Sequence, residues 1–252
     1  MSYYATNAVY KLLEAHRNEQ FIWASGTAWI LLYADNTAHV RAVAFVSGHS
    51  MGSTDSQIVD RLKAAETTAN LLAEIAQLPF AVIQFDNRAA SIDRVELNGN
   101  SIELSALRDW FSKVGLPVNA GATQKPINSA ESSAYHNWQR NNLGSIKVSD
   151  VDLIRIDAGA KSVAELVELK RSFDPLEKWK PYPQDFDNFN VVANLANRIG
   201  AKFTIAYNQR VSKTEIGDDA SRLSLFSYSK SNGPQILGVV TFDQFVKGAY
   251  LS

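Results

Sequence analysis

The sequence predicts an α/β protein in which a mixed β-sheet is flanked by helices, preceded by an N-terminal α/β region. Residues 55–77 repeat apolar positions at helical spacing. Residues 29–33 and 40–46 are short runs rich in aromatic and β-branched side chains, which are typical of strands. In the second half, the predicted elements follow the order helix, strand, strand, helix, strand, and this order favours an α/β core.

The composition fits a globular chain. Of the 252 residues, 46% are hydrophobic and 20% are charged, which excludes a disordered chain, a collagen-like repeat and a coiled coil. The 25 Lys and Arg against 26 Asp and Glu give a net charge of −1, which excludes a wholly basic nucleic-acid coat but allows a local basic patch. Cysteine is absent, so a disulfide framework, a thiolate zinc site and a cysteine nucleophile are excluded.

The sequence also carries expectations about location. Its first residues lack the cationic start and apolar core of a secretory signal. The longest apolar stretch, residues 21–34, is interrupted by polar residues and is too short to span a bilayer. We therefore expect a cytoplasmic protein with no membrane partner.

The first half contains alternating helix and strand signals. The run Asn98-Gly99-Asn100 lies between two strand-like segments and is a strong hairpin signal. Residues 47–53 match neither a phosphate-binding loop nor a nucleophile elbow, so we expect a plain loop. The expected elements are a helix at 3–17, strands at 29–33 and 40–46, a helix at 55–77, a strand at 80–85, strands at 92–97 and 102–104, and a helix at 105–114.

A segment rich in turn formers, residues 117–129, separates the two halves. We therefore expect an N-terminal region over residues 1–120, for recognition or dimerisation, and a second domain over residues 121–252. The elements expected in the second domain are a helix at 129–141, strands at 150–157 and 163–170, a loop at 173–187, a helix at 186–198, strands at 202–207, 223–228 and 236–241, and a helix at 242–248.

The chemistry-bearing residues gather in the expected hairpin of strands 150–157 and 163–170. If the hairpin is centred on Ala160, Asp152 faces Glu168 and Asp150 faces Lys170. Three carboxylates and one ammonium would then converge within about 5–8 Å.

Two opposed carboxylates destabilise a strand pair, and the cost rises as the surroundings become less polar. A divalent cation between them would reverse the sign, and hard oxygen ligands suit Mg²⁺, with Mn²⁺ as a substitute. The alternative is a solvent-exposed hairpin edge with ordinary charges.

The runs Val151-Asp152-Leu153-Ile154 and Val167-Glu168-Leu169-Lys170, joined by a short turn, resemble the catalytic core of the PD-(D/E)XK nuclease superfamily. The resemblance covers roughly residues 129–210, and Val151 stands where the proline of the family's name would be. It implies a restriction-endonuclease-like core and a Mg²⁺-dependent DNA endonuclease of restriction or phage type that hydrolyses phosphodiester bonds.

The resemblance also implies roles for particular residues. Asp152 and Glu168 would ligate the metal together with the Leu169 carbonyl, and the metal would activate water. Lys170 would neutralise the phosphate or polarise the water, because an ammonium beside two carboxylates stays charged. Glu131, in the preceding helix, would complete the metal shell, or it is an acid near a helix N-terminus with no further role.

A basic segment follows the motif. Arg171, Lys178 and Lys180 are interleaved with Trp179 and Tyr182, and cations beside aromatics can follow a nucleic-acid backbone and stack on bases. The alternative is a loop whose aromatics fill the core and whose lysines are solvated.

Two other classes of function remain open at this point. The chain could be a non-catalytic nucleic-acid-binding or assembly protein on the same scaffold, or a nuclease acting on RNA or single strands. His136 and Arg140 share a helix face that would either contact a phosphate or be solvated. A homodimer is considered because a DNA duplex needs two cuts.

Overall fold

The computed structural model describes residues 7–16, 18–24, 26–49, 56–119, 134–157, 162–211 and 217–251. The chain divides into two compact units, a discontinuous unit of Met1–Ile22 with Val151–Ser252 and a continuous unit of Trp23–Asp150. Neither division falls near residue 120, where the turn-rich segment 117–129 suggested a boundary. Sequence composition could not show the division, because an N-terminal strand pairs with the second half of the chain.

The continuous unit contains a mixed six-stranded sheet with the order β6-β5-β4-β3-β2-β7. Only β3 and β4 are parallel among its pairs. Its strands are β2 (Ala28–Ala34), β3 (Val40–His49), β4 (Phe80–Asp86), β5 (Arg94–Leu97), β6 (Asn100–Glu103) and β7 (Lys147–Asp150). The expected loop at 47–53 was wrong for its first three residues, which extend β3 because β4 pairs with them up to Asp86.

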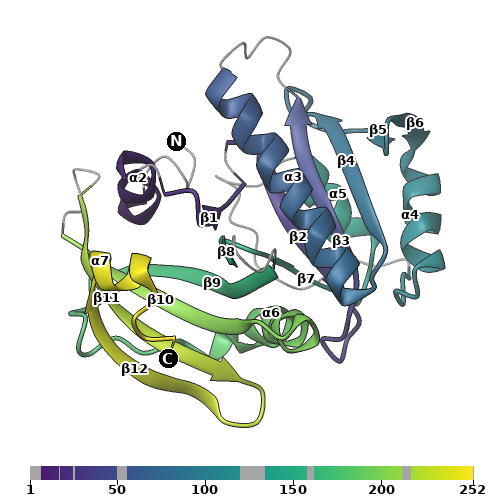
Figure 1. The fold of residues 1–252 in the computed structure, drawn as a ribbon. Coiled ribbons are helices and arrows are strands. Elements are labelled where there is room, and N and C mark those ends of the chain that lie inside the picture. Colours follow the sequence, from purple (N-terminus) through teal and green to yellow (C-terminus); the bar gives the residue numbers. More distant parts are fainter. Residues whose placement is uncertain are drawn as a thin grey trace. The chain divides into compact units, whose positions relative to one another are not determined.

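Helices lie on both faces of this sheet. α3 (Ser56–Ala76) packs on β2, β3 and β4 in front of the sheet in the view of Figure 1. α4 (Leu104–Lys113) and α5 (Ala134–Asn142) contribute to a separate buried cluster on the other face, which includes Leu107, Phe111 and Tyr135. The first residues of the helix expected at 129–141 lie outside the described part of the chain.

The turn between β5 and β6 has only two residues, Asn98 and Gly99. Both have positive φ, 51° and 79°, as a type I′ turn requires. Asn100 already pairs with Leu97, so the hairpin is tighter than the three-residue signal suggested.

The discontinuous unit contains a second mixed six-stranded sheet, with the order β1-β8-β9-β10-β11-β12. Of the described strand pairs in this sheet, β9 and β10 alone are parallel, and α6 (Phe186–Ile199) connects them, as a parallel pair requires a crossover. The strands are β1 (Phe21–Ile22), β8 (Leu153–Asp157), β9 (Ser162–Ser172), β10 (Lys202–Arg210), β11 (Asp218–Ser229) and β12 (Gly233–Thr241). With two such sheets, the expected mixed α/β class is confirmed.

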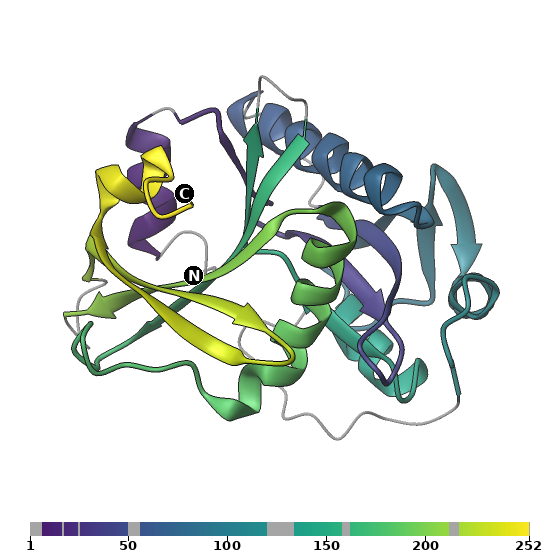
Figure 2. The same cartoon turned by 60° about the horizontal axis from the view of Figure 1, so that its bottom comes forward.

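The helices of this unit lie on different faces of its sheet. α6 packs on β9, β10 and β11. α2 (Ala8–Ala15) and α7 (Phe242–Lys247) both pack on β11, and Figures 1 and 2 show them side by side and away from α6. Because successive strand residues alternate in direction, Glu168 and Lys170 project from one face of β9 and Glu165 projects from the other.

A buried ion pair joins the α7 face to the sheet. Arg155 Nε donates to Glu165 Oε2 over 3.0 Å, and both side chains are buried. Arg155 also donates to the carbonyl of Phe245 (2.6 Å), and Tyr250 Oη donates to Glu165 Oε2 (2.7 Å). These bonds satisfy the buried charges, as a charge removed from water requires.

The single strand expected at 150–157 is in fact two strands in different sheets. Asp150 ends β7 and pairs with Leu31 in the continuous unit, whereas β8 begins at Leu153. Asp150 therefore does not face Lys170, and the expectation was wrong. Apolar periodicity shows that a segment is extended but not which sheet it joins.

Candidate active site

The β8–β9 hairpin has the register expected for its open end. Leu153 pairs with Val167 and Ile154 pairs with Leu166. Continuing this register by one residue places Asp152 opposite Glu168. The two side chains are only 6% and 7% exposed, so the hairpin holds two carboxylates in a largely buried position.

Hydrogen bonds fix Asp152 through both its side chain and its main chain. Its Oδ2 accepts a bond from the backbone N–H of Leu169 over 2.7 Å. Its carbonyl accepts a bond from Tyr10 Oη over 3.2 Å. The backbone of β9 therefore orients this carboxylate, and α2 holds the main chain that carries it.

Lys170 lies between two carboxylates on the α6 face of the sheet. Its Nζ is 2.9 Å from Glu168 Oε1 and 3.3 Å from Asp185 Oδ2. The ammonium also lies 5.4 Å from the centre of the Phe189 ring, so α6 provides one wall of the site. We refer to Asp152, Glu168, Lys170 and Asp185 as the acidic cluster.

Burial alone would lower the pKa of Lys170, but the carboxylates of Glu168, Asp185 and Asp152 outweigh it and raise the pKa above its usual value. Lys170 is thus a fixed positive charge at neutral pH. This direction agrees with electrostatic help to a phosphate and disfavours a role as general base.

The acidic cluster fits a divalent cation in charge and in ligand type. Three carboxylates against one ammonium leave an excess of two negative charges when all are ionised. Asp152, just before β8, and Glu168, on β9, offer hard oxygen ligands, which suit Mg²⁺. Among the residues that the structure describes, no group of three or more His, Asp or Glu side chains is placed to hold a metal ion.

Arg171 does not join the acidic cluster. Its Nη1 is 2.6 Å from Asp218 Oδ2, and the two side chains are 10% and 2% exposed. Strand alternation directs Arg171 to the face opposite Lys170, a signal that was already present in the sequence.

Lys178 and Lys180 are both exposed, whereas Trp179 between them is buried. The Trp179 ring stacks on Tyr207 with centroids 4.2 Å apart. Trp179 therefore fills the core, as the alternative for this loop expected. Lys178 and Lys180 remain at the surface, where they could meet either solvent or a nucleic acid.

Glu131, expected to complete the metal shell, lies outside the described residues. His136 packs edge-on against Trp29, with ring centroids 4.6 Å apart. Burial lowers the pKa of His136 to about 4, against an opposing effect of Asp150. His136 therefore stays neutral at neutral pH. Its ring packs against Trp29 and does not lie on an exposed helix face that could contact a phosphate.

Two contacts of the candidate site were not predicted from the sequence. Asp185 precedes α6 and belongs to a short 3-10 helix (Pro183–Asp185), and an acid at a helix start has a sufficient local explanation. Tyr10 reaches Asp152 across 142 positions, and a contact at that separation leaves no local pattern.

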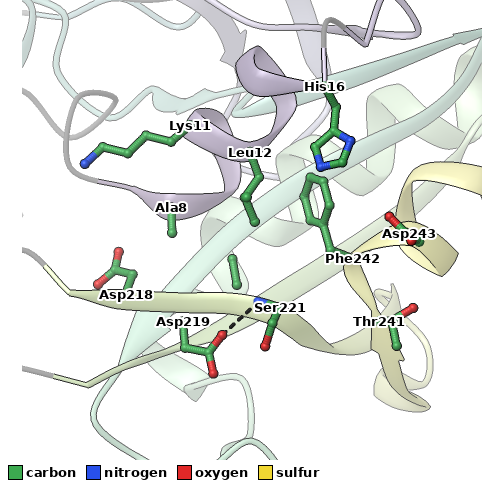
Figure 3. Close-up of a pocket in the computed structure, with 11 residues that line it drawn as sticks. Ala8, Lys11, Leu12, His16, Asp218, Asp219, Ser221, Thr241, Phe242 and Asp243 are labelled. Atoms are coloured by element: carbon green, nitrogen blue, oxygen red, sulfur yellow. Dashed lines mark hydrogen bonds between the residues drawn. The ribbon is translucent and has the colours of Figure 1, made fainter.

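A separate open pocket of about 550 Å³ lies between α2, β11 and the start of α7 (Figure 3). Its lining includes the apolar Leu12, Ala220 and Phe242. The His16 ring lies against Phe242 at 5.5 Å. None of the acidic cluster lines this pocket, so it is distinct from the candidate active site.

Comparisons with known proteins add no relative, since no family model, no curated protein and no solved structure matches the chain. None of the helices in the described part of the chain is long and apolar enough to cross a membrane.

Proposed function

We propose that the chain is a Mg²⁺-dependent endonuclease that hydrolyses phosphodiester bonds of DNA at the acidic cluster. The observation that carries the proposal is the placement of Asp152, Glu168 and Lys170 at the open end of one hairpin, with Leu169 between them. The parallel β9–α6–β10 unit beside the hairpin supports it, because that is the element order expected of a restriction-endonuclease-like core.

The residues have distinct roles in this proposal. Asp152 and Glu168 would hold the metal, with the Leu169 N–H keeping the Asp152 carboxylate in place. A bound Mg²⁺, or Mn²⁺ in its place, supplies activation of water and stabilisation of charge on the phosphoryl oxygens. Lys170, held by Glu168 and Asp185, adds a fixed positive charge beside the phosphate.

Location and assembly belong to the same proposal. A cytoplasmic enzyme acting on DNA agrees with a cysteine-free chain. A homodimer would allow both strands of a duplex to be cut, with the continuous unit contributing recognition or dimer contacts.

The test is a cleavage assay on supercoiled plasmid, linear duplex and single-stranded DNA, with and without Mg²⁺. We expect metal-dependent cutting that is lost in Lys170→Met and retained in Lys202→Ala, an exposed lysine of β10. Circular dichroism would verify that both variants are folded. Cutting that survives Lys170→Met and Asp152→Asn would refute the proposal.

Metal binding separates the remaining alternatives. Calorimetry should detect Mn²⁺ binding that Asp152→Asn weakens. A folded protein that neither binds metal nor cleaves DNA or RNA would be a non-catalytic scaffold. Metal-dependent cutting of RNA alone would replace DNA by RNA as the proposed substrate.

A further inference from the structure

One aromatic ring lies exposed beside the acidic cluster. Tyr182 is 40% exposed and comes three positions before Asp185, which binds Lys170. Single exposed aromatics are common on protein surfaces, so the exposure of Tyr182 alone does not indicate a function. The contacts that hold its ring and the charges around it do.

The Tyr182 ring is held on two sides. Its Oη donates to Asp174 Oδ2 over 3.1 Å, and its ring meets Trp179 edge-on at 5.9 Å. Trp179 stacks on Tyr207, whose Oη donates to the carbonyl of Asp174 over 2.6 Å. The ring is therefore pre-organised before any ligand arrives, which lowers the entropic cost of binding.

The supporting stack lies on the same face as the catalytic lysine. Tyr207 pairs with Lys170 in the parallel β9–β10 ladder, and paired residues of neighbouring strands project to the same side of a sheet. Trp179 covers Tyr207 on that side. Tyr182, which meets the Trp179 of this stack and comes three positions before Asp185, is thus on the same side of the sheet as the acidic cluster.

The surface around Tyr182 provides cations. Lys178 and Lys180 are exposed on either side of the buried Trp179. Of the nearby acids, Glu177 pairs with Arg222 over 3.2 Å and Asp174 accepts bonds from the hydroxyls of Ser172 and Tyr182. The lysines remain to meet an anionic backbone.

We propose that Tyr182 stacks on one unpaired base of the substrate strand while Lys178 and Lys180 contact its phosphates. Bases inside a duplex are stacked on one another, so a protein ring can take a base face only where the strand is unpaired or splayed. The inference rests on the proposed function and adds to it a preference for single-stranded or frayed sites next to the cleaved bond.

The chain provides a matched control in Phe173, which is 43% exposed and three positions after Lys170. The guanidinium of Arg210 lies 5.6 Å from the centre of the Phe173 ring. Arg210 approaches Asp218, which also pairs with Arg171 on the other face of β9. Phe173 is therefore an exposed aromatic of similar size that should not contact the base.

The experiment measures fluorescence anisotropy of a labelled oligonucleotide in EDTA, so that binding is observed without cutting. We expect wild-type protein to bind the single strand at least tenfold more tightly than the matching duplex. Tyr182→Ala should weaken single-strand binding about tenfold, Phe173→Ala should not change it, and Lys178→Ala with Lys180→Ala should reduce its salt dependence.

The same variants are then assayed for cleavage in Mg²⁺, which separates the two proposals. Equal binding of duplex and single strand, unchanged by Tyr182→Ala, would overturn the inference even if Lys170-dependent cutting persists. Tyr182-dependent binding without cleavage would retain the base-binding site and remove the nuclease. Binding of a protein or peptide in place of any oligonucleotide would overturn the inference.

Thermal unfolding shows whether Tyr182→Ala is folded, and Tyr182→Phe, which keeps the ring, should retain most of the affinity.

Discussion

Asp152 accepts a hydrogen bond from the backbone N–H of Leu169 over 2.7 Å, so a candidate metal ligand just before β8 is held by the residue that separates Glu168 from Lys170 on β9. The bond satisfies one carboxylate oxygen within the protein. It also makes the position of the carboxylate independent of bound metal, a form of pre-organisation that favours catalysis.

Replacing Asp152 with asparagine tests charge separately from shape. The amide oxygen of Asp152→Asn can still accept from Leu169, so we expect little change in unfolding temperature. Removing the negative charge should weaken metal binding and reduce cleavage about 10²- to 10³-fold. Single-turnover cleavage measures this loss. The control is Asp157→Asn, at the exposed end of β8. Equal losses in both variants would contradict a special role for Asp152.

Asp185→Asn tests whether Asp185 positions Lys170. The variant loses one charge-assisted contact that holds the ammonium in place, which is worth about 1.5 kcal/mol. We therefore expect kcat to fall roughly tenfold, with little change in KM. Asp185→Glu should recover part of the rate because it restores the charge. If KM rises while kcat stays constant, Asp185 instead contacts the substrate.

Arg171→Met distinguishes a structural ion pair from a nucleic-acid contact. The variant removes the 2.6 Å partner of Asp218, which is 2% exposed, and leaves Arg210 at 3.5 Å. We expect a loss of about 2 to 4 kcal/mol in the free energy of unfolding, because a buried charge loses its main partner. Urea denaturation measures the loss, and affinity for DNA under native conditions should stay within about twofold; a large drop in affinity with unchanged stability would return Arg171 to the binding surface.

His136 should make the protein acid-sensitive. Its pKa is lowered to about 4 in the folded state, below the usual value near 6.5. The unfolded chain therefore binds the proton first as pH falls, so the stabilising effect is complete above pH 6.5 and is lost progressively between pH 6.5 and 4. The loss is about 2 to 3 kcal/mol.

The measurement is the free energy of unfolding from urea titrations at pH 7.5, 6 and 5. His136→Gln should flatten this dependence, and His39→Gln, whose side chain is 63% exposed, should leave it unchanged. An identical acid slope in wild type and His136→Gln would exclude His136 as its source.

How much the sequence predicts differs between local and long-range features. The hairpin register at Leu153 and Val167 follows from a short turn and paired apolar strands, and the structure has it. The turn at Asn98-Gly99 follows from the residues that tolerate positive φ. Both depend on neighbouring residues, which is why a single sequence is sufficient.

The errors share a different physical origin. The segment containing Val151 leaves one sheet and enters another, and no turn former marks the change between Asp150 and Leu153. Asp185 was missed since its partner Lys170 is fixed by tertiary packing. The direction of Arg171, away from Lys170, follows from the alternation of side chains along β9.

The pairing of β1 with β8 also determines when the discontinuous unit can form during synthesis. Ile22 pairs with Ile154 and Phe21 pairs with Arg155, so the whole continuous unit is translated between the two partners. A ribosome that adds roughly 5–20 residues per second therefore leaves β1 without its partner for several seconds, while residues 23–150 can already fold. The chain leaves the discontinuous unit after Ile22 and returns at Val151, and these points adjoin the paired strands β1 and β8. Joining Ile22 to Val151 by a short linker is therefore a direct route to a form of the protein that contains this one sheet.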